Sequence, residues 1–472
     1  EKAFDSISWK FIDKTLNFFN FGPDIVHWVH TFYSQISSCV SVNGRNSAWF
    51  KIARGVRQGD PLSCYLYLLC AEILSNMLRE NEKVRGIKVG ENEFLLSQFA
   101  DDTALCLDGS EESFVEAVKI LTFFANVSGL KINYEKTQVI WIGSRKNCQV
   151  RYMRDRNFCW DPGTFKYLGV SFSTNVDCIV KLNYEGKLDE VRKLLSVWSK
   201  RQLTPFGKIT VLKTLAISKL TYLFVNLPDP DDIFLKELDC MFFKFLWNGK
   251  QSKISKKHMC QSYERGGLKM LNVYVFLSCM KLSWLRRMFS SSDSTLKDFV
   301  LCLYPDLHKL HLLGGEFTNI LMNTIHNPFW HDVLKYFKRL NGKCVPNDIH
   351  DFNAEFIFYN SNITVGHHTL YFKSWLNAGI FQVCHLLNDD GNYLPFDEFC
   401  GKYFVLKVNF LQYRGVIDAI RQYQNKLQVE TMAGYKLQTV KIWKIINEGN
   451  NSVQRLFTDM DLLPVGIQKW NN

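Results

Sequence analysis

Residues 93–107 read Glu-Phe-Leu-Leu-Ser-Gln-Phe-Ala-Asp-Asp-Thr-Ala-Leu-Cys-Leu, and this segment is apolar on both sides of two adjacent acids, Asp101 and Asp102. Two short apolar runs that flank a polar pair predict two strands joined by a tight turn. Adjacent carboxylates repel each other, and aspartate is depleted from strand interiors. We therefore predict a hairpin whose tip carries both carboxylates. A hard divalent cation such as Mg²⁺, which prefers oxygen ligands, would relieve their repulsion.

A helix is predicted on each side of this hairpin. Asp60 and Pro61 have the pattern of an N-cap and a first helical residue, and the helix they begin continues through Leu78. Ser110 precedes the second helix, and Gly129 is placed to end it as a left-handed cap. Four apolar residues at helical spacing are expected on one face of that second helix: Phe114, Val118, Leu121 and Ala125. Short strands mixed with helices over the first ~170 residues indicate an α+β fold.

The composition suits a packed chain with a polyanionic partner. The chain has 472 residues, which at ~150 residues per domain corresponds to about three domains. Hydrophobic residues make up 47% and charged residues 22%, as in ordinary globular proteins rather than disordered chains. The formal net charge of +11 and the pI of about 8.9 favour non-specific attraction to polyanions.

Cysteine usage and hydropathy exclude two classes of protein. Fourteen cysteines are scattered singly, without the paired spacing of a zinc knuckle. We therefore expect reduced, buried thiols in an intracellular protein. The apolar stretch at residues 64–71 is far shorter than the ~20 residues that span a bilayer, so no membrane association is expected.

The chain changes character after its first third. Residues 175–288 have a helical and basic pattern, and a lysine-rich loop at 250–257 follows the aromatic run 242–247. From Phe289 onward the sequence is aromatic and mixed in charge, with no phosphate loop or repeat, so its role cannot be inferred from its residues.

Four motifs together resemble the reverse transcriptases of non-LTR (LINE-type) retrotransposons. The segment 99–102, Phe-Ala-Asp-Asp, is similar to the catalytic hairpin of that family. Residues 54–63, Arg-Gly-Val-Arg-Gln-Gly-Asp-Pro-Leu-Ser, are similar to its second palm motif, which is long and specific. Gly-Leu-Lys-Ile-Asn at 129–133, followed by Lys136 and Thr137, resembles the fourth motif, and 165–170 resembles the primer-gripping hairpin. The four occur in the family's order.

The resemblance implies an architecture and an activity. We expect an α+β right-hand polymerase palm, an antiparallel sheet packed on helices, at residues 1–172 with a remnant of the fingers. A helical basic thumb at 173–290 and a mostly helical C-terminal region at 291–472 would follow. The implied activity is RNA-directed DNA polymerisation, with an RNA template, a DNA primer, deoxynucleoside triphosphates and two Mg²⁺ ions. The resemblance also implies a nuclear location; it implies no oligomeric state.

The first palm motif has a particular consequence for activity. Residues 1–5, Glu-Lys-Ala-Phe-Asp, match the tail of the family pattern D-x-E-K-A-F-D, whose metal-binding aspartate would stand two positions before Glu1. Asp5 is the trailing aspartate of the pattern and is not expected to replace that ligand. Because two-metal transfer needs carboxylates from more than one strand, we expect this chain to be inactive in primer extension.

The resemblance also assigns roles to single residues around the predicted metal ligands, Asp101 and Asp102. Phe4 would lie under the incoming sugar and exclude a 2′-hydroxyl; its alternative is an ordinary core aromatic. Gln58 and Gly59 would contact the incoming nucleotide and the template. Lys136 would act as general acid for the leaving pyrophosphate, or would simply be a solvated lysine.

Further residues would hold the nucleic acid. Arg54 and Arg57 would contact phosphate or template, or form part of a solvated basic strip. The primer grip would consist of Tyr167, Leu168 and Gly169. Lysines and arginines along the thumb helices would bind phosphates independently of sequence. Two alternatives remain at this point: a catalytically dead nucleic-acid-binding remnant of an element, and a group II intron maturase.

Overall fold

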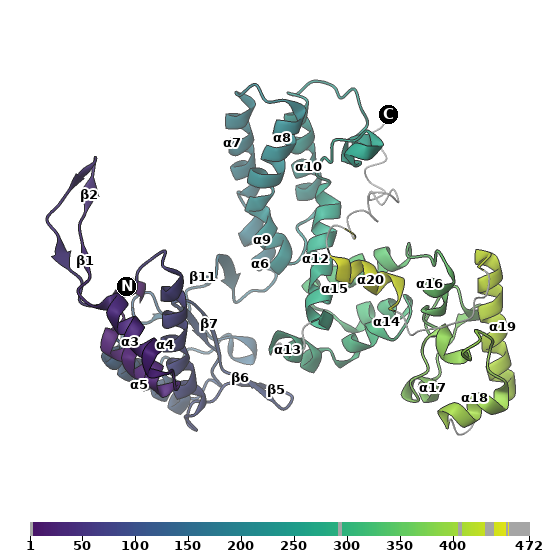
Figure 1. Cartoon of the computed structure of the whole chain (residues 1–472), viewed down its shortest axis with the longest axis horizontal. Helices are drawn as coiled ribbons and strands as arrows, with labels where there is room; N and C mark the ends of the chain where they lie inside the picture. The colour runs from purple at the N-terminus through teal and green to yellow at the C-terminus, as the bar shows by residue number, and fades with distance from the viewer. Residues whose placement is uncertain (1–2, 291–294, 405–407, 430–438, 450–451, 453–472) are drawn as a thin grey trace. The chain divides into compact units, whose positions relative to one another are not determined.

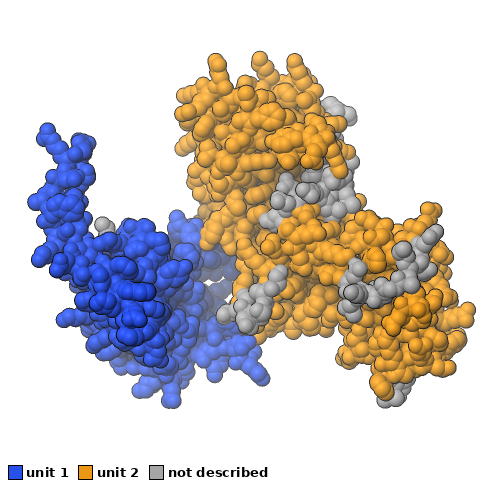
Figure 2. All heavy atoms as spheres, in the orientation of Figure 1, with its two compact units in different colours: residues 1–179 blue, residues 180–472 orange. Residues whose placement is uncertain are grey.

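The computed structural model of this chain describes residues 3–290, 295–404, 408–429, 439–449 and 452, and divides into two compact units (Figures 1 and 2). Unit 1 covers residues 1–179 and unit 2 covers residues 180–472. Helices and short strands alternate in unit 1, whereas unit 2 is mostly helical. The α+β class is thus as expected, while the predicted domain boundaries at 172 and 290 stay predictions.

Unit 1 is built around two long helices, α4 and α5, which pack on each other (Figure 1). Its core is a single cluster that includes Ile12 and Leu16 of α2, Leu66 and Leu74 of α4, and Phe124 of α5. The helices of this unit are α1 (Ala3–Ser6), α2 (Trp9–Phe18), α3 (Pro23–Tyr33), α4 (Pro61–Arg79) and α5 (Glu111–Ser128), the 3-10 turn η1 (Gly143–Arg145), and α6 (Cys178–Tyr184), which crosses into unit 2.

The strands of unit 1 differ from the expected single antiparallel sheet. Among the described residues every ladder has two strands, and the pair β9–β10 is parallel. The other ladders are antiparallel: β1–β4, β2–β3, β5–β6, β7–β8 and β11–β12. Strands of two to four residues offer few ladder hydrogen bonds, so each pair depends on its turn and on the helices beside it. The strand bounds are β1 (Ser37–Ser38), β2 (Ser41–Val42), β3 (Arg45–Asn46), β4 (Phe50–Lys51), β5 (Ile87–Val89), β6 (Asn92–Phe94), β7 (Leu96–Phe99), β8 (Asp102–Leu105), β9 (Gln138–Val139), β10 (Cys159–Trp160), β11 (Thr164–Tyr167) and β12 (Val170–Ser173).

The predicted ends of α4 and α5 are confirmed. The Asp60 carboxylate accepts a hydrogen bond from the Leu62 amide at 3.1 Å, and Pro61 is the first helical residue. Ser110 accepts from the Ser113 amide at 3.3 Å, and Gly129 ends α5 with φ of 83°. These caps satisfy helix-end groups that would otherwise lack partners.

The buried face of α5 differs from the expected one. Of the four residues predicted to share the core face, only Val118 is fully buried. The fully buried positions of α5 are Ser113, Ala117, Val118, Ile120, Phe124 and Ser128. Phe114 instead packs against a second aromatic group made of Tyr152, Phe158 and Trp160. The helix therefore has two apolar neighbours, and its apolar pattern is wider than one stripe.

Helix α4 is the one described helix that is, taken singly, long and apolar enough to cross a membrane; the bent pair Pro205–Ala216 and Ser218–Asn226 also passes if taken as one span. In this structure α4 contributes Leu66, Tyr67, Cys70, Leu74 and Leu78 to the unit 1 core.

Unit 2 is organised around α12 (Val273–Ser290), which packs against α9, α10, α15 and α20 (Figure 1). Most of its described side chains are buried, as expected for a helix with neighbours on all sides. The remaining elements of this unit are α7 (Lys187–Ser199), α8 (Pro205–Val211), the π-helical turn η2 (Leu212–Ala216), α9 (Ser218–Asn226), α10 (Asp232–Leu246), α11 (Lys256–Cys260), η3 (Tyr263–Arg265), α13 (Thr295–Leu303), η4 (Pro305–His311), α14 (Phe317–Thr324), α15 (Pro328–Asn341), α16 (Ile349–Asn353), β13 (Thr364–Val365), β14 (His368–Thr369), α17 (Lys373–Asn377), η5 (Val383–Leu386), α18 (Phe396–Tyr403), α19 (Phe410–Leu427) and α20 (Lys441–Glu448).

The cysteines are all free thiols, but few are buried. Only Cys70, Cys279 and Cys384 are fully buried, and three others, Cys64, Cys106 and Cys178, are exposed. The expectation of buried thiols was therefore wrong for most of them. The small side chain of cysteine tolerates either environment, so single cysteines carry little positional information.

Two segments of residues 173–290 that are distant in the sequence meet in space. The buried Lys208 side chain donates to the Leu246 carbonyl at the end of α10 (3.1 Å) and to the Asn248 side chain. A lysine at a helix C-terminus satisfies carbonyl groups that have no partner in the helix. Trp247, between the two acceptors, is half-buried with its indole nitrogen inside the protein.

Candidate active site

The two adjacent carboxylates lie at the tip of a hairpin, as predicted. Strands β7 and β8 pair so that Phe99 is opposite Asp102, which leaves Ala100 and Asp101 as the turn. Ala100 has φ of 52°, a left-handed conformation that allows so short a connection. The side chains of both Asp101 and Asp102 belong to exposed residues, so an ion or a ligand can reach them from solvent.

The hairpin is held in place by side chains from two other parts of unit 1. The Ser75 hydroxyl of α4 donates to the Gln98 side chain of β7 at 2.6 Å. The Tyr167 hydroxyl, at the end of β11, donates to the carbonyl and the hydroxyl of Ser97, both at 3.4 Å. The predicted primer-grip hairpin is therefore formed, with Leu168 and Gly169 as its turn at φ of 47° and 82°, and it contacts the carboxylate hairpin.

Phe4 packs on α4 at Tyr67, a residue close to the carboxylate hairpin. The Phe4 ring stacks on the Tyr67 ring of α4, with centroids 4.7 Å apart and planes inclined by 12°. Burial, together with a smaller contribution from the negative charge of Asp101, raises the pKa of Tyr67 to about 12. Tyr67, which sequence patterns did not single out, thus stacks on Phe4 and lies close enough to Asp101 for the charge of that carboxylate to affect its pKa.

The loop at residues 54–60 packs against the segment that follows Phe4. The Val56 amide donates to the Phe4 carbonyl at 2.6 Å, and the Gly55 amide donates to the Ile7 carbonyl at 2.8 Å. Gly55 has φ of 91°, and a Cβ atom there would lie 2.8 Å from the Asp5 carbonyl oxygen. Only glycine combines that dihedral angle with so close an approach.

The polar side chains of this loop point outward. Gln58 donates its amide hydrogen to the Asp5 carboxylate at 3.3 Å, so Asp5 is engaged by the loop. Arg54, Arg57 and Gly59 are exposed, and a Cβ at Gly59 would meet nothing within 4 Å. The loop therefore presents two guanidinium groups and an open stretch of backbone to solvent, as a surface for phosphate or nucleotide would.

Lys136 lies in a turn after Asn133. Its amide donates to the Asn133 carbonyl at 3.2 Å and to the Asn133 side chain at 3.1 Å, and its side chain is exposed. In the part of unit 1 that the structure describes, no hydrogen bond or ion pair joins this side chain to the carboxylate hairpin. Its predicted role as a proton donor stays a prediction.

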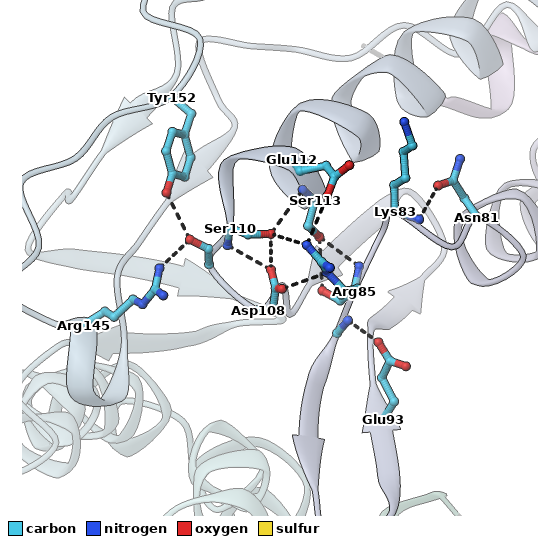
Figure 3. A network of polar contacts seen from close by, with 12 residues as sticks. Asn81, Lys83, Arg85, Glu93, Asp108, Ser110, Glu112, Ser113, Arg145 and Tyr152 are labelled. Carbon is cyan, nitrogen blue, oxygen red and sulfur yellow. Dashed lines mark hydrogen bonds and ion pairs between the residues drawn. The ribbon is translucent and has the colours of Figure 1, made fainter.

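A polar network fixes the far end of the hairpin (Figure 3). The Arg85 guanidinium forms ion pairs with Asp108 at 3.1 Å and with Glu112 at 3.3 Å. Ser110 donates its amide and its hydroxyl to the Asp108 carboxylate at 2.9 and 2.7 Å. Burial works against the charge of Asp108, but these hydrogen bonds and the charge of Arg85 hold its pKa below the usual range. Tyr152 and Arg145 both donate to the Gly109 carbonyl.

The donor set at the tip fits part of a magnesium site. Two exposed carboxylates supply the oxygen ligands that Mg²⁺ prefers. Over the described ranges no group of three or more His, Cys, Asp or Glu side chains converges as a metal site would require. Asp101 and Asp102 are the residues that would hold a magnesium ion here, and among the described residues Asp5 does not join them in a group of three or more.

The positive charge of the chain is concentrated in residues 180–290. This segment holds 20 lysines and arginines against nine aspartates and glutamates, a difference equal to the net +11 of the whole chain. Such a concentration on a few helices gives a strong local potential for polyanions.

Comparison with protein families identifies the class of unit 1. Residues 1–172 match the model of the reverse transcriptase (RNA-dependent DNA polymerase) family. The matched range ends within β12, so it contains the carboxylate hairpin, the loop at 54–60 and most of the hairpin that carries Tyr167. Residues 1–172 are a reverse transcriptase domain.

The relatives narrow this class. The chain is 30% identical over 254 residues to the transposon TX1 uncharacterized 149 kDa protein of Xenopus laevis, covering 53% of this chain and 19% of that protein. It is 28% identical over 230 residues to the Pol polyprotein of the type-2 retrotransposable element R2DM of Drosophila melanogaster, covering 46% and 21%. A Pol polyprotein of a type-1 retrotransposable element R2 from Nasonia vitripennis is 26% identical over 209 residues, covering 40% and 19%.

The reverse transcriptase match of residues 1–172 and the similarity to proteins of the TX1 and R2 retrotransposons support a reverse transcriptase of the non-LTR (LINE) type, as the four motifs predicted. It spans about a fifth of the length of each relative named above. The residues that sequence reasoning missed are those that support the site from α4, namely Tyr67 and Ser75. The sequence feature that could have pointed to Tyr67 and Ser75 is their position on α4, the helix that follows the second palm motif.

Proposed function

We propose that unit 1 supplies the nucleotidyl-transfer centre of an RNA-directed DNA polymerase, which adds deoxynucleotides to a primer 3′ end on an RNA template. The observation that carries this proposal is the exposed hairpin whose tip presents Asp101 and Asp102, next to Tyr67, on which Phe4 stacks. The family match to residues 1–172 supports the reaction type. Magnesium use is general to this family, and Asp101 and Asp102 are the residues that would hold the ion here.

The surroundings of the carboxylates suggest how each residue would act. A bound Mg²⁺ would stabilise the charge that develops on the transferred phosphate and on the leaving oxygen. The rigid Phe4 ring, stacked on Tyr67, would present a flat surface to the sugar and leave no room for a 2′-hydroxyl. Gln58, oriented by its hydrogen bond to Asp5, would contact the incoming nucleotide, with Arg54 and Arg57 close by in the same loop.

The contact of Tyr167 with Ser97 supports a primer-gripping role for the β11–β12 hairpin. A primer end held by this hairpin would lie close to Asp101, because β7 leads directly into the turn that carries Asp101. The helices of residues 180–290 would bind the phosphates of the RNA–DNA hybrid through their excess of lysine and arginine. Such a duplex is recognised by its shape and backbone more than by its base edges.

The metal site can be tested without relying on turnover. Mn²⁺ would replace Mg²⁺ and be followed by electron paramagnetic resonance with the full chain, an RNA–DNA hybrid and a deoxynucleoside triphosphate. We expect Asp101→Ala to lower Mn²⁺ occupancy strongly and Asp102→Ala to lower it less. Asp5→Ala is the matched control, because this exposed carboxylate is held by Gln58, and it should leave occupancy unchanged.

Primer extension on an RNA template is the second readout. Any synthesis by the chain should fall at least about a hundredfold in Asp101→Ala, because charge stabilisation by the metal would be lost. Unchanged Mn²⁺ occupancy in Asp101→Ala, or synthesis that persists in that variant, would remove the hairpin from the mechanism. Binding of an RNA–DNA hybrid without any synthesis by the wild-type chain would instead favour a nucleic-acid-binding protein that catalyses nothing.

A further inference from the structure

An exposed pair of aromatic rings lies in the basic part of unit 2, away from any residue assigned above. Phe206 is the second residue of α8 and Tyr263 is the first residue of η3; these residues are 54% and 52% exposed. The ring centroids are 5.8 Å apart and the planes are inclined by 51°. The Lys269 ammonium sits 4.8 Å from the Tyr263 centroid. The hydration of large exposed rings is unfavourable, so we expect a ligand to cover them.

The segment around these rings is strongly basic. Residues 248–269 contain six lysines and arginines and a single acid, Glu264. Lys256 is used in an ion pair with Asp239 of α10, but Lys250 and Lys253 are exposed and have no ion-pair partner in the described part of unit 2. A ligand that complements this mixture of rings and cations must carry both flat apolar groups and negative charge. Nucleic acid carries both.

The rings stand on a well-supported scaffold. The amides of Leu268 and Met270 both donate to the Met259 carbonyl at 3.1 and 2.8 Å, and Met259 itself is buried. Gly267 fits tightly, since a Cβ there would lie 2.2 Å from the Gln261 carbonyl oxygen. On the other side, Lys208 joins α8, which carries Phe206, to the end of α10. A rigid support lowers the entropy cost of ligand binding.

We propose that Phe206, Tyr263 and Lys269, with Lys250 and Lys253, form a binding site for unpaired nucleotides of a single-stranded nucleic acid. Bases would stack on the two rings, and the lysines would contact the adjoining phosphates. Stacking of this kind is independent of sequence and contributes about 1–3 kcal/mol per base. The inference rests on the proposed function only in taking nucleic acid as the ligand, and it names a surface distinct from the hairpin of Asp101.

A single strand suits the surface better than a duplex. Two rings inclined by 51° offer separate faces to successive bases, and base faces are accessible only where the strand is unpaired. A duplex would meet the surface with its phosphates alone and would leave the rings uncovered. Single-stranded RNA and single-stranded DNA share the required chemistry, so the experiment has one arm for each.

The test uses the full chain and three labelled probes of about 12 nucleotides: an RNA strand, a DNA strand of the same sequence, and a blunt RNA–DNA hybrid. Each strand carries 2-aminopurine, whose fluorescence falls when it stacks on an aromatic ring. We expect Phe206→Ala with Tyr263→Ala to weaken single-strand binding at least about tenfold and to abolish quenching. Hybrid binding should change by less than about twofold.

Phe410→Ala is the matched control, because Phe410 is similarly exposed (49%) on α19 of the same unit. Tyr263→Phe should retain both affinity and quenching, while Lys250→Gln with Lys253→Gln should reduce the salt dependence of single-strand binding. Circular dichroism and thermal melting check that every variant is folded.

Unchanged single-strand affinity in the double alanine variant would overturn the proposal. Equal losses for single strand and hybrid would overturn it too, because the rings would then serve general binding. The assays contain no divalent metal and no deoxynucleoside triphosphate. Their outcome therefore does not depend on whether Asp101 binds a metal ion. A preference for RNA over DNA in the wild-type protein would indicate that the 2′-hydroxyl is also read.

Discussion

The carboxylates of the two units are in opposite physical situations. Asp101 and Asp102 of unit 1 stand at an exposed turn, where like charges lie side by side. Asp229 of unit 2 is 10% exposed and Lys281 is completely buried, with 3.6 Å between the carboxylate and the ammonium group. The carboxylates of Asp101 and Asp102 are accessible from solvent, so a dissolved cation can reach them. For Asp229 the cation is the ammonium group of Lys281, a side chain of the protein itself.

The buried pair belongs to a dense set of interactions that joins two helices, α12 and α15, and the loop that follows α9. The Tyr336 hydroxyl of α15 donates to Asp229 at 2.7 Å, and the Asp229 amide donates to Asp332 at 2.8 Å. Lys281 donates to the Leu227 carbonyl and lies 4.7 Å from the Phe329 ring centroid. Burial lowers the pKa of Lys281 to about 8, although the nearby aspartates oppose that shift. Burial also raises the pKa of Asp229, with Asp332 adding to the effect.

The buried pair of Asp229 and Lys281 stabilises the fold, whereas the exposed pair of Asp101 and Asp102 is available to bind a ligand. A buried charge that loses its partner is left without solvent or counter-charge, so removing one partner is costly. An exposed acid can be removed at little cost to folding, because water solvates what remains. Exposed acids such as Asp101 and Asp102 can be replaced with little loss of stability, although their like charges repel each other. Acids of this kind are therefore the ones to which we assign a function.

The comparison predicts its largest contrast for two aspartate substitutions. Asp229→Ala should lower the free energy of unfolding by about 3–5 kcal/mol, because Lys281 would be left unpaired inside the protein. Asp101→Ala should change it by less than about 0.5 kcal/mol. Urea denaturation followed by circular dichroism measures both. Asp229→Leu with Lys281→Met should cost less than Asp229→Ala alone, and a larger cost for the double variant would contradict this account of the pair.

A second buried carboxyl extends the comparison to pH. Burial raises the pKa of Glu355 to about 7, although the Asn360 amide, which donates to this carboxyl at 3.1 Å, lowers it. The folded protein therefore holds a proton that the unfolded chain releases near pH 4.3, so stability should fall as the pH rises from about 4.3 to 7. The loss from this group is on the order of 3–4 kcal/mol, since one pKa unit corresponds to about 1.4 kcal/mol. Thermal melting across that range should show a flatter profile for Glu355→Gln; identical profiles would exclude Glu355 as the source.

Two glycines beside the exposed site provide a third, smaller contrast. Gly55→Ala should destabilise unit 1 by about 2 kcal/mol, since the new Cβ would press on the Asp5 backbone in addition to the strain of a positive φ. Gly59→Ala has the same strain, with φ of 90°, but open space around it, so about 1 kcal/mol is expected. Chemical denaturation of both variants decides this. Equal losses would mean that the close approach at Gly55 contributes nothing.

The smallest effect is expected among the surface polar groups of Figure 3. Ser110→Ala should cost about 1 kcal/mol, because the Ser113 amide loses its cap. Ser8 is the matched control: it occupies the N-cap of α2 without a side-chain hydrogen bond to the helix, so Ser8→Ala should be nearly neutral. Differential scanning calorimetry resolves the two. A Ser8→Ala loss as large as that of Ser110→Ala would show that the cap hydrogen bond is not the cause.

Much of the site was predictable from short stretches of sequence. The carboxylate hairpin, the caps at Asp60, Ser110 and Gly129, and the turn at Leu168 and Gly169 all depend on residues within a few positions of one another. Local dihedral preferences and nearby hydrogen bonds decide such features, so the sequence by itself determined them. The family was also readable at this level, because its motifs are short and keep their order.

Tertiary structure alone decided which distant residues meet. Phe4 with Tyr67, Ser75 with Gln98, Lys208 with Leu246 and Lys281 with Asp229 are pairs separated by long stretches of chain. The single predicted sheet became separate two-stranded ladders for the same reason, since strand pairing beyond a hairpin depends on how helices pack over it. Packing of whole elements sets these contacts, and no local pattern specifies the partner. The sequence determined which residues carry the charges; only the fold decided that Asp229 would be buried with a lysine and that Asp101 would remain open to an ion.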